Sequence, residues 1–303
     1  MNKYFIPILA SVILFVSACD NFEGEQEIPA YIKIKGFRLV ENTNLQYTQS
    51  EGFLTSAISD VWISFDGDTT MMAFPLKEGG VIPVLKKGKV KINVQAGILL
   101  NGIRGTRVYY PFYTTYEQEI TLTEEKITDL DTINIKYRSD WTTVPFDEQF
   151  EDSYMNFRTV GDSVTERLVK ISNPDSVRSG MYSGAMYMNA TDTAYKIICK
   201  DSIHYTDISQ GSIYLEIDYR SNIPLETGVY GFESGSNKYL YISAVTLNPS
   251  KDKWKKIYIQ LTKAWDQLNW PSDFWFYLQP SNPNKLNDGW VYIDNVKIVH
   301  FPD

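Results

Sequence analysis

Short runs in which apolar and polar residues alternate follow one another along most of the chain. Residues 31–35, 61–65 and 89–94 show this alternation in the first half, and residues 212–219 show it in the second. A period of two is typical of a strand with one buried face, and no segment keeps the apolar spacing of an amphipathic helix. The pattern therefore predicts an all-β protein.

The first half of the chain predicts a small sandwich. Expected strands are 31–35, 61–65, 81–85, 89–94, 117–122 and 132–137. Pro83 favours an edge position for its strand, because proline cannot donate to a sheet ladder. Asn101-Gly102 is a strong hairpin-turn signal. This many short strands in about 110 residues is typical of an immunoglobulin-like β-sandwich, which we place at residues 29–138.

The second half predicts a further, larger sandwich. Expected strands are 194–199, 212–219, 228–232, 238–243, 254–261, 273–278 and 289–299. With a first strand after the linker at 141, about eight strands fit a jelly roll over residues 139–303.

The N-terminus has the three parts of a secretory signal. Lys3 is followed by the uncharged apolar run 4–16, and Ser17-Ala18 stands before Cys19. The run is about a dozen residues, too short for a membrane span, which needs about 20. Residues 1–18 are thus predicted to be a cleaved signal. The alternatives are an uncleaved anchor, or an ordinary signal with an incidental cysteine.

The segment Val-Ser-Ala-Cys resembles a bacterial lipobox. The resemblance implies a lipid on the thiol of Cys19 and a membrane partner through that anchor. Residues 19–28 are acidic and predict a tether, and they resemble the surface-export signals of Bacteroidota lipoproteins; a plain soluble spacer is the alternative. The expected location is the outer membrane or the cell surface.

Composition excludes some functions. The 29 Lys and Arg residues stand against 37 Asp and Glu residues, for a net charge of −8, which is not the footprint of a nucleic-acid binder. With Cys19 acylated, only Cys199 remains, so no internal disulfide forms. Cys199 alternates with Ile197 and is expected to be a small core residue rather than a nucleophile.

Two stretches carry resemblances to known families. The strings DVWISFDG, VIPVL, GILLNGIRGTR and YPFY, within residues 57–113, resemble the N-terminal region of uncharacterised Bacteroidota lipoproteins. In the second half, FEDSY, WKKIYIQL and the closing WVYIDNVKIV resemble jelly-roll carbohydrate-binding modules, in which the last strand returns beside the first. The second resemblance implies glycan binding, although a fold does not fix a function.

Aromatic residues are the main functional lead. They make up 14% of the chain, with 21 tyrosines. We expect Trp265, Asp266, Asn269 and Trp270 to lie in a loop where rings stack on a sugar while polar groups bind its hydroxyls. The alternative is that the rings fill the sandwich, to which Trp275 and Trp290 are assigned as core or edge residues.

Several carboxylates are candidates for chemistry. Glu216 and Asp218 share a strand face, as in laminarinase-like hydrolases, but the second catalytic glutamate of that pattern is missing. We expect both to face solvent, with Leu215, Ile217 and Tyr219 toward the core. The jelly-roll resemblance also implies a structural calcium ion held by Glu148, Glu151 and Asp294; turn chemistry is the alternative reading of these residues.

One further cluster lies in the first half, where Arg104, Arg107, Tyr109, Tyr110 and Tyr113 crowd together. It predicts either a protein-binding patch or a strand with a stacked arginine. The leading hypothesis for the protein is a non-catalytic envelope lipoprotein that binds glycan. The alternative is a structural or accessory subunit that binds an outer-membrane protein, and a hydrolase ranks third.

Overall fold

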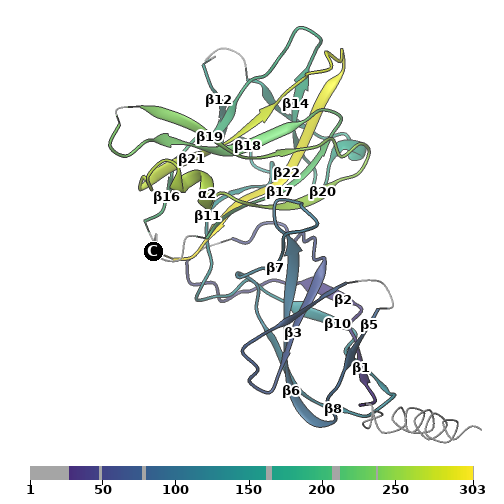
Figure 1. Ribbon diagram of the computed structural model, residues 1–303. Coiled ribbons are helices and arrows are strands. Elements are labelled where there is room, and N and C mark those ends of the chain that lie inside the picture. The colour runs from purple at the N-terminus through teal and green to yellow at the C-terminus, as the bar shows by residue number, and fades with distance from the viewer. Residues whose placement is uncertain are drawn as a thin grey trace, which may run out of the picture.

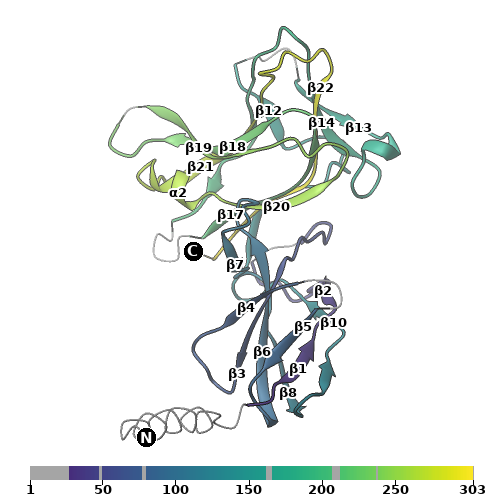
Figure 2. The same cartoon turned by 45° about the vertical axis from the view of Figure 1, so that its right-hand side comes forward.

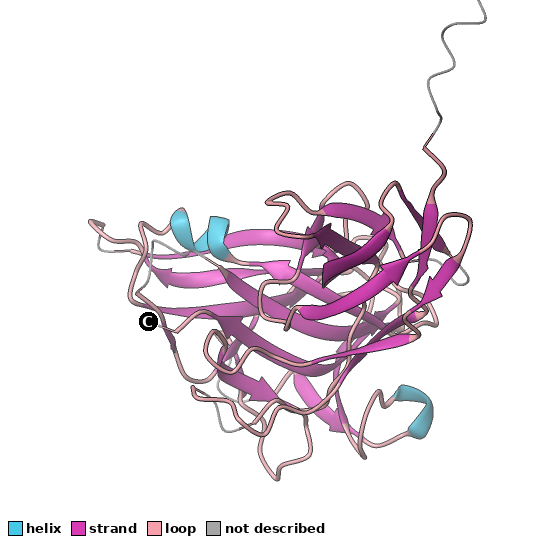
Figure 3. Cartoon of the chain, turned by 90° about the horizontal axis from the view of Figure 1, so that it is seen from below, coloured by secondary structure: helices cyan, strands magenta, loops and turns pink. Residues whose placement is uncertain are grey.

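The computed structural model describes residues 27–47, 50–76, 80–161, 166–206, 212–236 and 238–302. The signal, Cys19 and most of the tether lie outside these residues. Strands make up nearly all of the regular structure, which confirms the all-β prediction (Figure 3). Figures 1 and 2 show a C-terminal sandwich, β11 to β22, standing on one end of an N-terminal region, β1 to β10. None of the helices among the described residues has the length and apolarity for crossing a membrane.

Among its described residues, the N-terminal region contains three sheets. The first has the order β5-β1-β9 and the second pairs β10 with β2, with β1–β9 and β10–β2 parallel. The third has the order β4-β3-β6-β7, with β8 on β6. The strands are β1 (Ala30–Lys33), β2 (Gly36–Leu39), β3 (Asp60–Phe65), β4 (Met72–Pro75), β5 (Val81–Val84), β6 (Gly88–Leu99), β7 (Arg107–Tyr109), β8 (Tyr116–Leu122), β9 (Ile127–Asp129) and β10 (Thr132–Ile135).

In the part of the C-terminal sandwich that the structure describes, two six-stranded sheets pack face to face. One has the order β13-β14-β22-β17-β20, with β11 on β22, and the other β12-β15-β21-β18-β19, with β16 on β21. The elements are β11 (Thr143–Glu148), β12 (Phe157–Thr159), β13 (Leu168–Ile171), the 3₁₀ helix η1 (Pro174–Ser176), β14 (Ser183–Met188), β15 (Ile197–Cys199), β16 (Ile203–His204), β17 (Ile213–Ser221), β18 (Leu225–Phe232), β19 (Tyr239–Leu247), β20 (Lys255–Gln260), α2 (Thr262–Asp266), β21 (Asp273–Pro280) and β22 (Gly289–His300).

Local sequence signals account for several of these features. Pro83 lies on β5, which is an edge strand of its sheet, as predicted. The last strand, β22, pairs with the first strand of the sandwich, β11, again as predicted. Asn101 and Gly102 have φ of 55° and 69° in the turn between the antiparallel strands β6 and β7, so the hairpin signal is confirmed.

The two regions meet in an extensive contact, here called the junction. The β6–β7 turn docks on β20: the backbone N–H of Asn101 donates to the carbonyl of Tyr258 at 2.8 Å, and its Oδ1 accepts from the Gln260 N–H at 2.9 Å. Tyr214, Tyr258, Val299 and Phe301 join the core of the N-terminal region. One face of the β22-β17-β20 part of the sheet therefore packs against the N-terminal region.

Tyr110 and Tyr113 are buried in this junction. The Tyr110 ring centroid lies 4.8 Å from that of Tyr258 and 5.3 Å from that of Tyr214. Arg107 pairs with the buried Asp60, and the Tyr109 ring packs on Trp62 at 5.8 Å. The predicted Arg/Tyr patch is thus split: its buried tyrosines bind the protein's own C-terminal sandwich, while Arg107 and Tyr109 stay at the surface.

Glu216 is fully buried at the junction. Its carboxylate accepts from the Tyr110 hydroxyl at 2.6 Å and the Tyr137 hydroxyl at 2.9 Å, and Lys256 Nζ lies 3.3 Å away. The neighbouring Asp218 is also fully buried and accepts from Thr55 Oγ1 at 2.5 Å and Asn295 Nδ2 at 2.9 Å.

The expectation that Glu216 and Asp218 face solvent is wrong. Leu215, Ile217 and Tyr219 do face the sandwich core, as predicted, but the N-terminal region covers the opposite face of β17. Buried carboxylates persist when charge-assisted hydrogen bonds surround them. Because neither carboxylate is accessible, this pair does not offer the open cleft that polysaccharide hydrolysis needs.

Candidate functional site

An aromatic surface lies on the outer face of the β12-β15-β21-β18-β19 sheet. Along β21, Phe274, Phe276 and Leu278 point into the sandwich core, so the alternating Trp275 and Tyr277 lie on the other face. Strand register places Tyr230 of β18 beside Trp275, and Tyr241 of β19 beside Tyr230. We call the set Tyr230, Tyr239, Tyr241 and Trp275 the aromatic platform; Tyr277, which is only 1% exposed, packs against Tyr241 with ring centroids 5.4 Å apart.

The rings of the platform form one continuous cluster. Tyr230 stacks on Tyr241 with centroids 4.3 Å apart and an interplanar angle of 21°. Tyr239 lies 5.4 Å from Tyr230, and Trp275 lies 5.7 Å from Tyr230. The outermost ring, Tyr239, is 54% exposed. Rings that support one another in this way offer a preorganised apolar surface with hydroxyl groups at its rim.

Polar groups flank the platform. The Tyr277 hydroxyl donates to the Glu226 carboxylate at 2.7 Å, and burial, followed by this carboxylate, raises the pKa of Tyr277. The Lys196 ammonium lies 4.8 Å from the Tyr241 ring centroid, a cation–π distance. The Trp275 indole N–H donates to the Lys200 carbonyl at 3.4 Å. A few polar groups around aromatic rings are the usual composition of a small-ligand site.

A shallow pocket of about 340 Å³ continues the platform at one end. It is lined by Phe232, Tyr239 and Trp275 together with Pro271 to Asp273. The segment after Trp270 leads directly into Trp275, and the pocket places it next to Phe232 of β18 and Tyr239 of β19.

The structure places the four predicted ligand residues differently. Trp265 is only 1% exposed, and its indole N–H donates to the Pro271 carbonyl at 2.9 Å. Its position in α2, rather than in the expected loop, directs the ring into the core beside Tyr205. We therefore reassign Trp265 from ligand contact to core residue.

Asp266, Asn269 and Trp270 are exposed. Asn269 and Trp270 have φ of 56° and 50°, and left-handed backbone is a genuine outlier for a bulky residue such as tryptophan. Such strain often accompanies function. The Trp270 side chain is 48% exposed and adjoins the pocket through Pro271. A role for these three residues in binding stays a prediction.

Sequence reasoning missed the platform tyrosines. The signal was present, because Tyr239 and Tyr241 alternate in one strand, as do Tyr230 and Phe232 in another. Trp275, which the sequence predicts to be a core or edge residue, is partly exposed on the outer face. Trp290 is also partly exposed, stacked on Tyr292 with centroids 4.5 Å apart on the opposite sheet.

The three carboxylates of the calcium prediction already have donors. Glu148 accepts from the N–H groups of Phe150 at 2.7 Å and Asn156 at 2.6 Å. Glu151 accepts from two N–H groups of the segment after Gly180. Asp294 accepts from Ser183 Oγ at 2.8 Å, and burial raises its pKa to about 6.

No group of three or more His, Cys, Asp or Glu side chains is placed to hold a metal ion within the described ranges. A calcium site here would therefore need backbone carbonyls among its main ligands, which calcium accepts. The calcium prediction stays a prediction.

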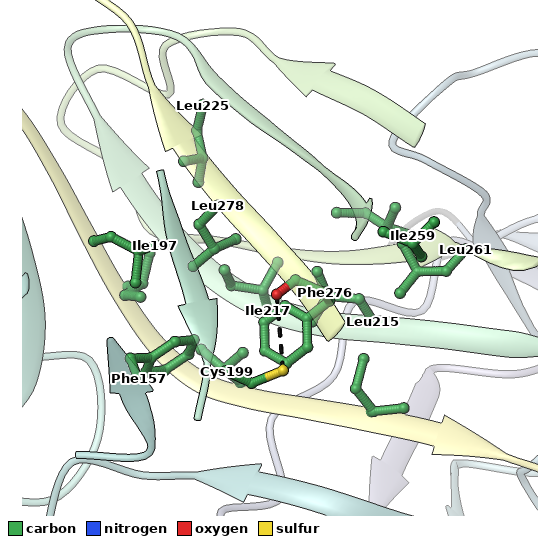
Figure 4. Close-up of a cluster of buried hydrophobic side chains, with 14 of the residues drawn as sticks. Phe157, Ile197, Cys199, Leu215, Ile217, Leu225, Ile259, Leu261, Phe276 and Leu278 are labelled. Carbon is green, nitrogen blue, oxygen red and sulfur yellow. Dashed lines mark hydrogen bonds between the residues drawn. The ribbon is translucent and has the colours of Figure 1, made fainter. Parts of the chain in front are cut away.

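Cys199 lies in the sandwich core, as the sequence predicts. Figure 4 shows it among Phe157, Leu215 and Phe276. Its thiol donates to the Phe276 carbonyl at 3.8 Å. Burial raises the pKa of this thiol to about 12. A nucleophilic cysteine needs a lowered pKa, so the surroundings of Cys199 oppose that role.

Comparisons with known proteins complete the description. No protein-family model and no curated protein matches the chain. The CBM22-2 xylan-binding domain from Paenibacillus barcinonensis Xyn10C is 15% identical, covers 51% of this chain and 98% of its own, and gives a TM-score of 0.36.

Two further solved structures are similar in the same way. A family 11 carbohydrate-binding module from Clostridium thermocellum, in complex with a β-1,3-1,4-mixed-linked tetrasaccharide, is 12% identical over 53% of this chain and 96% of its own, with a TM-score of 0.36. TmCBM61, in complex with β-1,4-galactotriose, is 10% identical over 50% of this chain and 89% of its own, with a TM-score of 0.30.

Proposed function

We propose that this protein is a non-catalytic glycan-binding module whose ligand lies across the aromatic platform. The observation that carries the proposal is the stacked cluster of Tyr230, Tyr241 and Trp275, with the exposed Tyr239 at its edge. Sugar rings present apolar C–H faces and hydroxyl edges. Aromatic faces match the former, and the flanking Glu226 and Lys196 match the latter.

The location of the protein is part of the proposal. The lipobox-like sequence ending at Cys19 supports a lipid anchor, with residues 20–28 as a tether at the cell envelope. Expression in a bacterial host with a Cys19→Ser variant in parallel tests it. The native chain is expected in the membrane fraction with an acylated N-terminus detectable by mass spectrometry, and the variant in the soluble fraction. A soluble, unacylated native chain would contradict the anchor.

The binding proposal is tested with a glycan array and the soluble chain 20–303. Trp275→Ala is expected to lose at least tenfold in affinity, as central aromatic anchors do at binding sites, and Tyr239→Ala is expected to lose less because Tyr239 lies at the edge of the platform. Tyr187→Ala is the matched control, because Tyr187 is similarly exposed but pairs with Tyr292 on the opposite sheet. Trp270→Ala reports whether the neighbouring turn takes part.

The outcomes separate the alternatives. Selective binding that Trp275→Ala abolishes and Tyr187→Ala preserves supports the platform. Binding that only Tyr187→Ala abolishes moves the site to the opposite sheet. Silence across a broad array contradicts glycan binding. Thermal unfolding of each variant checks that it is folded.

A second candidate function is an accessory role through binding of an outer-membrane protein. One face of the β5-β1-β9 sheet exposes Val81 and Ile127. Val81 of β5 lies opposite Lys33 of β1, and Ile127 of β9 lies opposite Tyr31 of β1. Exposed apolar residues on one sheet face favour a protein contact. Cross-linking in the intact envelope tests this role: a partner captured by the native chain but not by Ile127→Asp supports it, and equal capture by both contradicts it.

A further inference from the structure

A second cleft, distinct from the aromatic platform, lies at the junction of the two regions. It has a volume of about 700 Å³ and is lined from both sides. Segments 56–59 and 101–103 contribute from the N-terminal region. Arg178, the end of β19 and the start of β20 contribute from the C-terminal sandwich. This volume lies in the usual range for ligand sites, which occur preferentially between domains. We call it the junction cleft.

The charge of the junction cleft is opposite to that of the whole chain. Among the described residues, its lining includes Arg178, Lys255 and Lys256 but no aspartate or glutamate, in a chain whose net charge is −8. Lys256 Nζ lies 3.3 Å from the buried Glu216, and Arg178 is paired with the buried Asp218, so both charges are compensated from behind the wall. The exposed Lys255 supplies positive charge to an incoming ligand, and the exposed part of Arg178 supplies N–H donors.

Arg178 is held in place for this role. Its Nε lies 3.3 Å from the fully buried Asp218, while 39% of the side chain stays exposed. A guanidinium has five N–H donors, so a contact through Nε leaves the terminal donors for a second acceptor. Fixing an arginine through one edge prepares the other edge for a bidentate carboxylate.

The indole of Trp254 also lines the cleft, but its Nε1 is buried and out of reach of a ligand. The remaining walls include the apolar side chains of Ile58, Ile103 and Ile257.

We infer that the junction cleft binds a carboxylate-bearing sugar residue of the hexuronate class. The carboxylate is received by Arg178, and the apolar ring face lies against the isoleucine walls. The site goes beyond the aromatic platform and does not depend on it, because no platform residue lines the junction cleft.

The test uses titration calorimetry on the soluble chain 20–303 with trigalacturonate as the probe. Its methyl ester is the matched ligand, equal in shape but without the charges. Trigalacturonate is expected to bind, the ester at least tenfold more weakly, and Arg178→Gln is expected to lose at least tenfold toward trigalacturonate. Arg178→Lys, which keeps the charge without the planar donor set, is expected to fall between.

Ile103→Trp tests the junction cleft without removing Arg178, the arginine that pairs with the buried Asp218. Ile103 is 51% exposed, so a larger side chain is tolerated while it fills the junction cleft. It is expected to abolish trigalacturonate binding, whereas Trp275→Ala is expected to leave it unchanged. Absence of binding, equal binding of acid and ester, or loss in Trp275→Ala with retention in Ile103→Trp would each overturn the inference. Binding of neutral glycans that is lost in Trp275→Ala and kept in Ile103→Trp would still support the aromatic platform.

Discussion

The hydroxyl of Tyr110 in the N-terminal region donates a 2.6 Å hydrogen bond to the buried carboxylate of Glu216, 106 residues later in the C-terminal sandwich. Tyr137 donates to the same carboxylate, and Lys256 neutralises it. Burial raises the pKa of Tyr110 and Tyr137 well above the ordinary value, so both hydroxyls keep their protons and remain donors. This relationship ties the two regions together through polar groups as well as apolar packing.

Removal of one donor from this network is expected to destabilise the protein. A hydrogen bond to a charged group contributes about 1.5–3 kcal/mol, so Tyr110→Phe should lower the free energy of unfolding by about 2 kcal/mol. Tyr109→Phe is the neighbouring control, because its exposed hydroxyl should change stability by less than about 0.5 kcal/mol. Urea unfolding measures both, and equal stability of the two variants would contradict the role given to Tyr110.

The two tryptophans around α2 are expected to differ sharply in stability effects. Trp265 is buried with its indole N–H bonded to Pro271, so Trp265→Ala should cost about 3–5 kcal/mol through the cavity it leaves. Trp270 is half exposed, and Trp270→Ala should stay within about 0.5 kcal/mol of the native chain. Thermal and urea unfolding measure the stability of both variants. Similar losses of stability in the two would show that the core assignment of Trp265 is mistaken.

Asp294 is expected to make stability depend on pH. Its pKa is raised from 3.8 to about 6, chiefly by burial. Between these values the folded protein holds a proton that the unfolded chain has lost. The contribution of Asp294 is therefore fully present below pH 3.8 and is lost as the pH rises through about 6, by about 3 kcal/mol in total.

Comparison of urea unfolding at pH 4.5 and pH 7 isolates this effect. The stability difference between the native chain and Asp294→Asn should change across that interval in favour of the variant at the higher pH. Asp252→Asn, at a carboxyl whose side chain is 92% exposed, is the control and should give parallel curves. Parallel curves for Asp294→Asn as well would refute the raised pKa.

Cys199 is expected to resist alkylation in the native protein. Its thiol is buried and its pKa is raised to about 12, so almost no thiolate forms near neutral pH. Iodoacetamide at pH 8 should leave the chain 20–303 unlabelled by mass spectrometry and should add one group after denaturation in urea. Full labelling without denaturant would contradict the core position.

The calcium prediction has a direct test. If calcium binds near Glu148, Glu151 and Asp294, added calcium should raise the thermal midpoint, because a ligand at 100 times its Kd stabilises by about 2.7 kcal/mol. Excess EDTA should reverse the shift, and Glu151→Gln should reduce it. A midpoint that neither calcium nor EDTA moves would dismiss the prediction.

Much of the fold could be predicted because its signals are local. The alternation of Leu215, Ile217 and Tyr219 marks the core face of β17, and Pro83 marks an edge strand. The β6–β7 turn follows from Asn101-Gly102, whose residues adopt positive φ at low cost. In each case, the physical preference depends on a few neighbouring residues.

The candidate site was less accessible to sequence reasoning. Trp265 and Trp270 stand in one short segment, yet one is core and the other surface, because α2 turns the first ring inward. The platform combines Tyr230, Tyr241 and Trp275, and only the pairing of β19 and β21 with β18 brings these rings together. Pairing between strands that are far apart in the sequence, such as β18 and β21, leaves no mark in the local pattern.

The sequence by itself determined the all-β character, the positions of many strands and the core face of those strands, since alternation reports directly which side chains avoid water. Only the tertiary structure decided what covers the other face. Glu216 and Asp218 look solvated in the pattern, but the packing of the N-terminal region on β17 buries them, with tyrosine, lysine and asparagine partners drawn from both regions. The reason is physical: alternation distinguishes the two faces of a strand, whereas their final burial depends on contacts between segments more than 100 residues apart.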